Sequence, residues 1–279
     1  MTKKQRRTVQ VVVKEVTLII ITIVMLLPIL LSITMSFETP PEVFTYPPRI
    51  FPNTFYLGNY VNAFNSIKLG RLLINSLIMS VIIVVGKTVF GILAGYAFAN
   101  FKFKGSAFLF ALLFVTIFMP ADMIMIVPLY KLMVNFHWLN TYWALTVPFT
   151  ASATSVFLMR QYFLTIPKEL EDAARIDGAS SMRYLTRILI PLSKTMIGSV
   201  IVINFVYAWN FYLWPLVVIN SNSMQTAQIG LQMLMITGAT RNWGIITAGT
   251  IIVLAPVLIL FFAVQNLFVQ GIVTTGLKE

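Results

Sequence analysis

Long apolar stretches alternate with short polar segments along the whole chain. A helix that crosses a bilayer needs about 20 mostly apolar residues. Windows of about that length span residues 16–36, 72–99, 107–130, 142–159, 195–219 and 245–269. Hydrocarbon offers no hydrogen-bond partner to an unpaired backbone amide, so each window is predicted to be a helix. No series of short alternating strands favours a barrel. The pattern predicts an all-α integral membrane protein with six transmembrane helices.

The composition supports this interpretation. Hydrophobic residues make up 58% of the 279 residues and charged residues only 10%, whereas a soluble domain carries about 25% charged residues. The basic start of the chain, followed by an apolar stretch, also fits a secretory signal peptide. That stretch is longer than the roughly 7 to 15 residues of a signal core, which favours an uncleaved membrane anchor.

Cysteine is absent and histidine occurs once. No disulfide framework and no thiolate metal site can therefore form. The single histidine, His137, lies in a cluster with Trp138 and Trp143, and such aromatic residues gather at membrane interfaces. His137 is interpreted as an interface residue, so the sequence predicts no metal site and no catalytic residue.

The net charge of +11 follows the membrane topology. Segments on the side of the two termini carry fourteen Lys and Arg residues, and the opposite segments carry five. Basic residues accumulate on the cytoplasmic side, so both termini are predicted to be cytoplasmic. Because the basic residues lie beside spans, the expected partner is membrane lipid and not nucleic acid. The topology gives a cytoplasmic N-terminus over 1–15, an extracytoplasmic loop over 37–71, a cytoplasmic loop over 160–194 and a cytoplasmic tail over 271–279.

The long cytoplasmic loop, residues 160–194, has the pattern of two short helices. Pro167 suits the first position of a helix, and acidic residues follow where the helix dipole favours negative charge. Gly178 supplies a left-handed stop. Ser180 can cap a second helix that ends at Pro191. One side of that second helix is predicted to carry Met182, Leu185, Ile188 and Leu189.

The second helix also carries Arg183 and Arg187, four residues apart. Two like charges at this spacing repel each other slightly, and they become favourable beside lipid phosphates or an acidic protein surface. The loop is therefore interpreted either as a docking site for a partner or as an interfacial helix pair that only links two spans.

The spacing in this loop resembles the EAA loop of binding-protein-dependent ABC importer permeases. The family pattern is Glu-Ala-Ala, three residues, Gly, nine residues and Ile-x-Leu-Pro. Here Asp172-Ala173-Ala174 is followed by three residues and Gly178, and then by nine residues and Ile188-Leu189-Ile190-Pro191. Asp replaces Glu and Ile190 replaces Leu. Both replacements keep the charge or the apolar character, so they bear on the docking contact and not on the family.

The resemblance extends over nearly the whole chain. Segments similar to the carbohydrate-uptake importers of this family are Asn75-Ser76, 94–99, 209–215 and 265–271. The stretches 151–167 and 191–195 are similar in particular to the second permease subunit of glycerol-3-phosphate importers. The resemblance implies a type I ABC importer transmembrane domain, with a core over residues 72–270 that contains the EAA loop.

The family also implies partners and a mechanism. A homologous permease forms a heterodimer with this chain, two ATP-binding cassette subunits dock on the EAA loops, and an extracytoplasmic solute-binding protein delivers the solute. No Walker-type glycine-lysine loop occurs in the sequence, so ATP and Mg are expected on the partner ATPase, and this chain is predicted to hold no cofactor and to be no enzyme. The coupling residues implied are Glu171, Asp172, Ala173, Ala174, Arg175, Asp177, Gly178 and Pro191.

Several polar or aromatic residues within the spans are candidates for the solute pathway. Lys87 lies mid-span, where charge is costly; it can attract an anionic phosphate, snorkel to the interface or bond to carbonyls of a neighbouring helix. Asp122 is a candidate for the pathway or for a structural pair with the partner permease. A further cluster is predicted to anchor the fifth span at the interface or to form an outer gate or sugar-stacking surface: Trp209, Asn210, Tyr212 and Trp214.

Two other classes of protein compete with this interpretation. A secondary transporter would show an inverted repeat with paired broken helices, and an intramembrane enzyme would need a Ser/His pair or clustered acids at membrane depth. Neither pattern is evident. The predicted function is a permease subunit that carries glycerol 3-phosphate or a related phosphodiester or carbohydrate by alternating access, with a neutral oligosaccharide as the alternative solute.

Overall fold

The computed structural model describes residues 3–47, 49, 51–119, 124–237 and 242–275, with side chains placed from residue 10 to residue 265. Regular structure within these ranges is helical and includes no strand, which confirms the all-α prediction. The chain divides into two units, residues 1–69 with 230–253 and residues 70–229 with 254–279. Each unit has a buried core of its own.

The first unit begins with a long apolar helix. Its segments are α1 (Lys3–Phe37), the 3-10 helix η1 (Glu42–Phe44), α2 (Gly58–Ser66), most of α14 (Ala227–Thr237) and the start of α15 (Trp243–Thr275). Residues 10–37 of α1 form an apolar stretch whose most hydrophobic window contains no buried residue. Lipid or another apolar surface is the environment that such a helix requires. The helix predicted over 16–36 is confirmed and extends back to Lys3.

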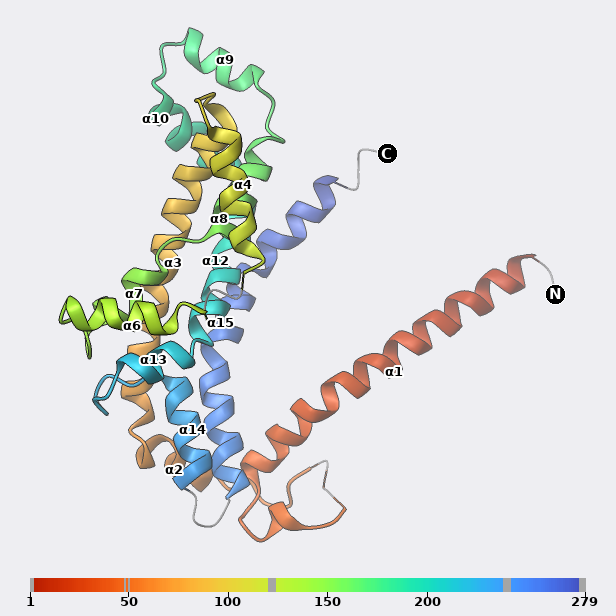
Figure 1. The fold of residues 1–279 in the computed structure, drawn as a ribbon. Coiled ribbons are helices and arrows are strands. Elements are labelled where there is room, and N and C mark those ends of the chain that lie inside the picture. Colours follow the sequence, from red (N-terminus) through yellow and green to blue (C-terminus); the bar gives the residue numbers. More distant parts are fainter. Residues whose placement is uncertain (1–2, 48, 50, 120–123, 238–241, 276–279) are drawn as a thin grey trace. The chain divides into compact units, whose positions relative to one another are not determined.

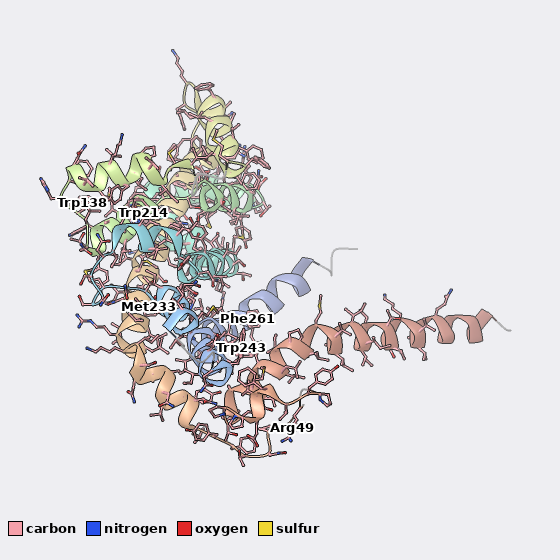
Figure 2. The ribbon with its side chains drawn as sticks, turned by 60° about the horizontal axis from the view of Figure 1, so that its bottom comes forward. Arg49, Trp138, Trp214, Met233, Trp243 and Phe261 are labelled. Carbon is pink, nitrogen blue, oxygen red and sulfur yellow. The ribbon has the colours of Figure 1, made fainter. Side chains whose placement is uncertain are left out.

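Polar contacts fasten the end of α1 to α2. The Asn59 side chain donates hydrogen bonds to the carbonyl oxygens of Ser36 at 3.0 Å and of Glu38 at 2.7 Å. Gly244 leaves room for this side chain, because a Cβ at position 244 would lie 2.5 Å from Asn59 Nδ2. The start of α15, where Trp243 is labelled in Figure 2, therefore packs against Asn59 of α2 within the first unit.

The second unit holds most of the helices (Figure 1). In chain order they are α3 (Leu69–Asn100), α4 (Ser106–Ile117), α6 (Ile126–Asn135), α7 (Tyr142–Thr146), the 3-10 helix η2 (Val147–Phe149), α8 (Ala153–Phe163), α9 (Glu169–Ile176), α10 (Ser181–Tyr184), the π-helix η3 (Leu185–Leu189), α11 (Ile190–Leu192), α12 (Lys194–Trp209) and α13 (Leu213–Val218). The start of α14 and the rest of α15 complete the unit.

Glycines let α3 approach the segment 150–160 closely. A Cβ added to Gly86, Gly91 or Gly95 would lie 2.7, 2.8 and 2.8 Å from the Cβ atoms of Thr150, Ser155 and Met159 respectively. Such distances are too short for any side chain to occupy these positions without displacing the neighbouring segment. Small residues bring two helix backbones together in membranes, where packing drives association. The three glycines therefore set the distance between α3 and α8.

A buried core joins α3 to α6, α7 and α13. Trp214 of α13 is 2% exposed, and its indole Nε1 donates a hydrogen bond to the Ala144 carbonyl oxygen at 2.8 Å. Trp138, which follows α6, packs against the same core; both tryptophans are labelled in Figure 2. The fully buried members of the core include Met79, Ile83, Ala144, Leu145, Ala208 and Val218.

Three described helices are long and apolar enough to cross a membrane on their own. They cover residues 10–37, 69–100 and 243–265. A pair formed by residues 181–192 and 194–209, bent by 79°, makes a fourth if it counts as one span. The remaining predicted windows contain shorter helices. The count of six crossings stays a prediction.

Three predicted windows are interrupted, so one continuous helix in each was wrong. In window 107–130, α4 ends at Ile117 and α6 begins at Ile126. In window 142–159, η2 and a non-helical segment separate α7 from α8. Pro148 lacks the N–H that continues a helix, and Ser152 Oγ caps the new helix α8 by accepting a hydrogen bond from the Ser155 amide at 3.3 Å.

The third interruption lies in window 195–219. Helix α12 ends at Trp209 and α13 begins at Leu213. The Asn210 side chain donates a hydrogen bond to the Val206 carbonyl oxygen at 2.8 Å, which occupies an acceptor at the end of α12. Helices α2 and α14 fall outside the six windows.

Candidate functional site

The predicted helix pair forms a platform beyond Asn100, the last residue of α3 (Figure 1). Residues 169–192, which comprise α9, α10, η3 and α11, are called the α9–α11 platform. Gly178 ends α9 with φ +75°, which confirms the left-handed stop. Ser180 caps α10, because its Oγ accepts a hydrogen bond from the Arg183 amide at 3.3 Å. Both local predictions follow from backbone chemistry alone.

Two details of the platform differ from the prediction. Helix α9 begins at Glu169, so Pro167 precedes it by two residues. Pro191 does not end the second helix, which continues to Leu192. The π-helix η3 ends at Leu189, two residues before Pro191, and widens the turn there. A widened turn relieves the clash between a proline ring and the carbonyl four residues earlier, so the helix tolerates the proline.

One face of the platform is buried against three helices of the second unit. Tyr96 of α3 donates a hydrogen bond from its hydroxyl to the Ser181 carbonyl oxygen at 3.3 Å. Burying a large apolar side chain stabilises by about 1.5–3 kcal/mol, so several such residues attach the platform firmly. The buried core is formed by Ile92 and Tyr96 of α3, Met159 and Phe163 of α8, Val200 of α12, and Ala174, Tyr184, Leu185 and Leu189 of the platform.

The opposite face exposes apolar side chains. Ile176, the last residue of α9, is 87% exposed, and Met182 is 59% exposed. The prediction that Met182 shares the side of Leu185 and Leu189 was wrong, because α10 turns Met182 outward. Of the two alanines, Ala174 is buried and Ala173 is exposed. Large apolar residues exposed together mark a surface for another protein or for membrane.

Glu171 faces inward, toward the end of α3. The Asn100 amide donates a hydrogen bond to Glu171 Oε2 at 2.6 Å, and Arg175 Nη2 pairs with Glu171 Oε1 at 2.6 Å. Both carboxylate oxygens are therefore engaged within the chain. The neighbouring acids Asp172 and Asp177 are exposed. Asn100 was missed at the sequence level, because its partner is 71 residues away.

The charge of Glu171 also affects the pKa of a buried tyrosine of the platform. Burial raises the pKa of the Tyr184 hydroxyl, and the negative charge of Glu171 raises it further. The Tyr184 ring lies 6.4 Å from that of Tyr96. The uncharged side chains of Tyr96 and Tyr184 thus fill the space between α3 and the platform. Among the described residues, no charged group lies between the two elements at this point.

A corner connects the platform to α12. Helices over residues 181–192 and 194–209 meet at 79°, and Ser193 between them is fully buried. Tyr162 of α8 donates a hydrogen bond to the Leu192 carbonyl oxygen at 3.2 Å, beside the corner. The corner between the platform and α12 is therefore tightly packed.

A cavity of about 520 Å³ lies farther along α3, within the second unit. Lys87 enters it from α3, Asn204 and Tyr207 from α12, and Ser152 and Thr154 from the start of α8. Mostly apolar residues of α4, α6, η2 and α12 and of the segments between them complete the lining. The volume falls in the range of about 300–1,000 Å³ that is typical of small-molecule sites.

Lys87 is 6% exposed. Its Nζ lies 3.7 Å from the centroid of the Tyr207 ring, a cation–π distance. Asn204 is also buried, and its amide donates a hydrogen bond to Ser155 Oγ at 2.9 Å. These contacts hold the polar side chains of the cavity in place. Tyr207 and Asn204 were missed at the sequence level, because a polar residue every few positions in an apolar helix has no distinctive pattern.

The pathway candidates on α12 and α13 and between them do not line this cavity. Asp122 lies outside the described residues. Trp209, like Trp214, is 2% exposed, so the two indoles are packed inside the unit. Asn210 is exposed and Tyr212 is half-buried. The described residues contain no group of three His, Asp or Glu side chains placed to hold a metal ion.

Comparison with known proteins assigns the class to which this fold and site belong. Residues 87–274 match the family described as binding-protein-dependent transport system inner membrane component. The chain belongs to this family, which confirms the assignment made from the EAA loop. It is therefore an inner-membrane transport subunit that crosses the bilayer more than once.

Particular relatives match over nearly their full length. The chain is 37% identical to the sn-glycerol-3-phosphate transport system permease protein UgpE of Rhizobium meliloti (strain 1021), over 97% of this chain and 99% of that protein. It is 36% identical to the protein of the same name from Yersinia pestis bv. Antiqua (strain Antiqua), over 93% and 94%.

A solved structure shows the same fold. A chain from the crystal structure of a bacterial ABC transporter involved in the import of the acidic polysaccharide alginate matches with a TM-score of 0.83 and 22% identity. The match covers 95% of this chain and 98% of that chain. The fold is thus that of an ABC importer permease, as predicted.

Proposed function

We propose that this chain is one permease subunit of an ATP-driven importer that carries glycerol 3-phosphate, or a related phosphodiester or carbohydrate, into the cytoplasm by alternating access. The observation that carries the proposal is the α9–α11 platform. One of its faces is buried on α3, α8 and α12, and the other exposes Ile176 and Met182. A body that presses on the exposed face displaces three helices at once.

The partners follow from this surface and from the family. Two ATPase subunits bind ATP and Mg and hydrolyse the nucleotide, one of them seated on the exposed face of the platform. A homologous permease completes the membrane domain, and an extracytoplasmic protein delivers the solute. The names of the UgpE relatives support glycerol 3-phosphate as the solute. This chain contributes the solute pathway and the surface that couples it to the ATPase. The ATPase subunits contribute the hydrolysis of ATP.

The proposed orientation places the platform and both termini in the cytoplasm. The segment between residues 37 and 71 then lies outside the cell. The distribution of Lys and Arg supports this arrangement, because an ATPase reaches the platform only from inside.

The natural absence of cysteine allows a direct test of this orientation. Ile176→Cys places a thiol on the exposed face, and Tyr46→Cys, at a side chain that is 95% exposed, places a matched thiol in the predicted outer loop. In intact cells, a membrane-impermeant maleimide is expected to label Tyr46→Cys and to leave Ile176→Cys unlabelled. In inside-out vesicles the pattern reverses.

The labelling rate of the thiol in Ile176→Cys also tests whether the ATPase binds to the platform. Binding of the ATPase subunits to inside-out vesicles is expected to slow the labelling of Ile176→Cys at least about tenfold, since a docked protein excludes the reagent. Labelling of Ile176→Cys from outside intact cells would contradict the proposal, because no cytoplasmic ATPase could then reach the platform.

A further inference from the structure

We propose that a groove between α3 and α4 binds an anionic phospholipid. An acyl chain of the lipid lies in the groove, and its phosphate lies beside Lys102 and Lys104, in the leaflet that borders the α9–α11 platform. The inference goes beyond the proposed function, because it concerns a lipid that the subunit holds and not the solute that it carries.

Helix α4 is fastened to the second unit along one side. Phe110 and Phe114, four residues apart, both contact Phe157 of α8, with ring centroids 6.3 and 5.3 Å from it. The Arg160 guanidinium of α8 lies over the Phe110 ring, 4.1 Å from its centroid. The structure describes the whole of α4, and no residue of this helix is fully buried. The neighbouring side of α4 is therefore open to another molecule.

This open side borders a groove of about 630 Å³. Figure 1 shows α4, in yellow, running beside α3. Apolar side chains of both helices form the walls of the groove: Phe90, Leu93 and Ala94 of α3 and Leu109, Leu112 and Leu113 of α4. Thr116 and Ser152 line both this groove and the cavity around Lys87, so the two spaces adjoin. An apolar surface of this size requires an apolar occupant.

The groove lies at the depth of lipid acyl chains. Ala94 and Phe90 precede Asn100, the last residue of α3, by six and ten residues, which corresponds to about 9 and 15 Å along the helix. Leu113 lies about 10 Å from the start of α4. The hydrocarbon of one leaflet is about 15 Å thick, half of the bilayer core. Residues 101–105, which join the two helices, then lie at the level of the headgroups.

This joining segment supplies positive charge. Lys102 and Lys104 are exposed, and neither forms an ion pair with another residue that the structure describes. Lys102 also borders a hollow that contains Asp172 of α9, and Lys104 does not line that hollow. Basic side chains just beyond a transmembrane helix attract anionic lipid phosphates, while their apolar stems stay in contact with hydrocarbon. One phospholipid satisfies both the apolar groove and the charged segment, whereas an apolar helix of another subunit satisfies the groove alone.

The first experiment identifies the occupant of the groove. A photoreactive benzoyl-phenylalanine replaces either Leu112, which lines the groove and is 56% exposed, or Phe108, which is 71% exposed on α4 and does not line it. The complete importer complex is purified in detergent, washed free of loosely bound lipid, irradiated and analysed by mass spectrometry. We expect an anionic phospholipid adduct at position 112 and little or none at position 108. An adduct of position 112 with another subunit, or none with lipid, would overturn the proposal.

The second experiment measures selectivity for the headgroup. The washed complex is titrated with phosphatidylglycerol or with zwitterionic phosphatidylethanolamine, and bound lipid is counted by native mass spectrometry. Phosphatidylglycerol is expected to bind at least about tenfold more tightly. Lys102→Ala/Lys104→Ala is expected to weaken its binding about 10- to 30-fold, because each lysine near the surface contributes about fivefold. Lys131→Ala, at an exposed lysine on α6, is the matched control and should bind phosphatidylglycerol normally.

The same measurement separates a lipid from a soluble anion. Inorganic phosphate at the concentration of the lipid is expected to leave phosphatidylglycerol bound, because phosphate has no chain to fill the groove. Displacement by phosphate would overturn the proposal, and so would equal binding of the two lipids or equal binding of phosphatidylglycerol by the double variant and the unmodified complex. The mass of the intact complex shows that each variant has assembled.

Discussion

The same helix, α3, is packed differently at its end and at its middle. Near Asn100 it is fastened to the α9–α11 platform by Glu171, by Tyr96 and by a continuous apolar core. At Lys87 it faces a cavity of about 520 Å³. A tightly packed region moves as one body, whereas an open region can change its shape. The contrast shows that α3 is packed tightly at one end and borders an open space in its middle.

The packing on either side of α3 makes this contrast concrete. Gly95, near the platform, has the Met159 Cβ and the Arg160 amide within about 3 Å of where its own Cβ would lie. Thr154, at the cavity, is exposed. Added volume should therefore be harmful at the first site and tolerated at the second.

The largest effect is expected from Gly95→Leu. A leucine side chain would force α3 away from α8, and overpacking of this kind costs about 1–3 kcal/mol or more. We expect little folded protein, measured as the yield and thermal stability of the complex purified in detergent. Thr154→Leu, which adds volume beside the cavity, is expected to keep a normal yield. Equal stability of Gly95→Leu and Thr154→Leu would show that α3 is not packed more tightly near the platform than at the cavity.

An intermediate effect is expected at Gly178. Its φ of +75° is costly for other residues, and a Cβ there would meet no atom of this chain within 4 Å. A leucine in this conformation costs about 1–2 kcal/mol, whereas asparagine tolerates it. Gly178→Leu should therefore assemble with the ATPase but uncouple hydrolysis from transport, with uptake per ATP reduced about tenfold.

Gly178→Asn is the matched comparison for Gly178→Leu. It keeps the left-handed conformation accessible, so it should retain most of the coupling. Unchanged uptake in Gly178→Leu would show that the left-handed turn has no part in transmission. Loss of coupling in both variants would show that the ATPase requires a residue without a side chain at position 178.

The smallest effect is expected from the contact between Asn100 and Glu171. Removing one of these groups leaves the other partly buried without its partner, which costs about 1–3 kcal/mol. Glu171→Ala and Asn100→Ala should each lower uptake per ATP about three- to tenfold while ATP hydrolysis continues. Glu169→Ala, at an exposed acid two residues earlier in α9, is the matched control.

A double-mutant cycle isolates the contact itself. If the two side chains act through each other, the Asn100→Ala/Glu171→Ala variant should be no worse than either single variant, with a coupling energy of about 1 kcal/mol. Additive losses would show that Glu171 acts on the ATPase, as the sequence alone predicted, and not on α3.

Local chemistry made part of this structure predictable. Gly178 and Ser180 end and begin helices through interactions within a few residues, so the sequence identified both. The long apolar windows that became α1, α3 and α15 were also found, because their length exceeds that of any soluble helix of similar composition. Lys87 was found because a charge in such a window is rare.

Contacts between distant segments were not predictable from the same pattern. Glu171 was assigned to the partner surface, and only its proximity to Asn100 turns it inward. Trp214 was expected at an interface or a gate, yet its indole is buried and bonded to Ala144. Windows that hold Pro148 or Asn210 looked continuous, because mean apolarity does not register a single residue that ends a helix.

The 79° corner between residues 192 and 194 has a mechanical consequence. Helix α12 has 16 residues, and its cavity residues Asn204 and Tyr207 lie about 15–20 Å from the corner at about 1.5 Å per residue. Rotation of the joined arms by about 5° would carry these two side chains about 1.5 Å sideways, roughly the radius of a water molecule. A small tilt of the platform would thus be enough to widen or narrow the cavity that these two side chains line.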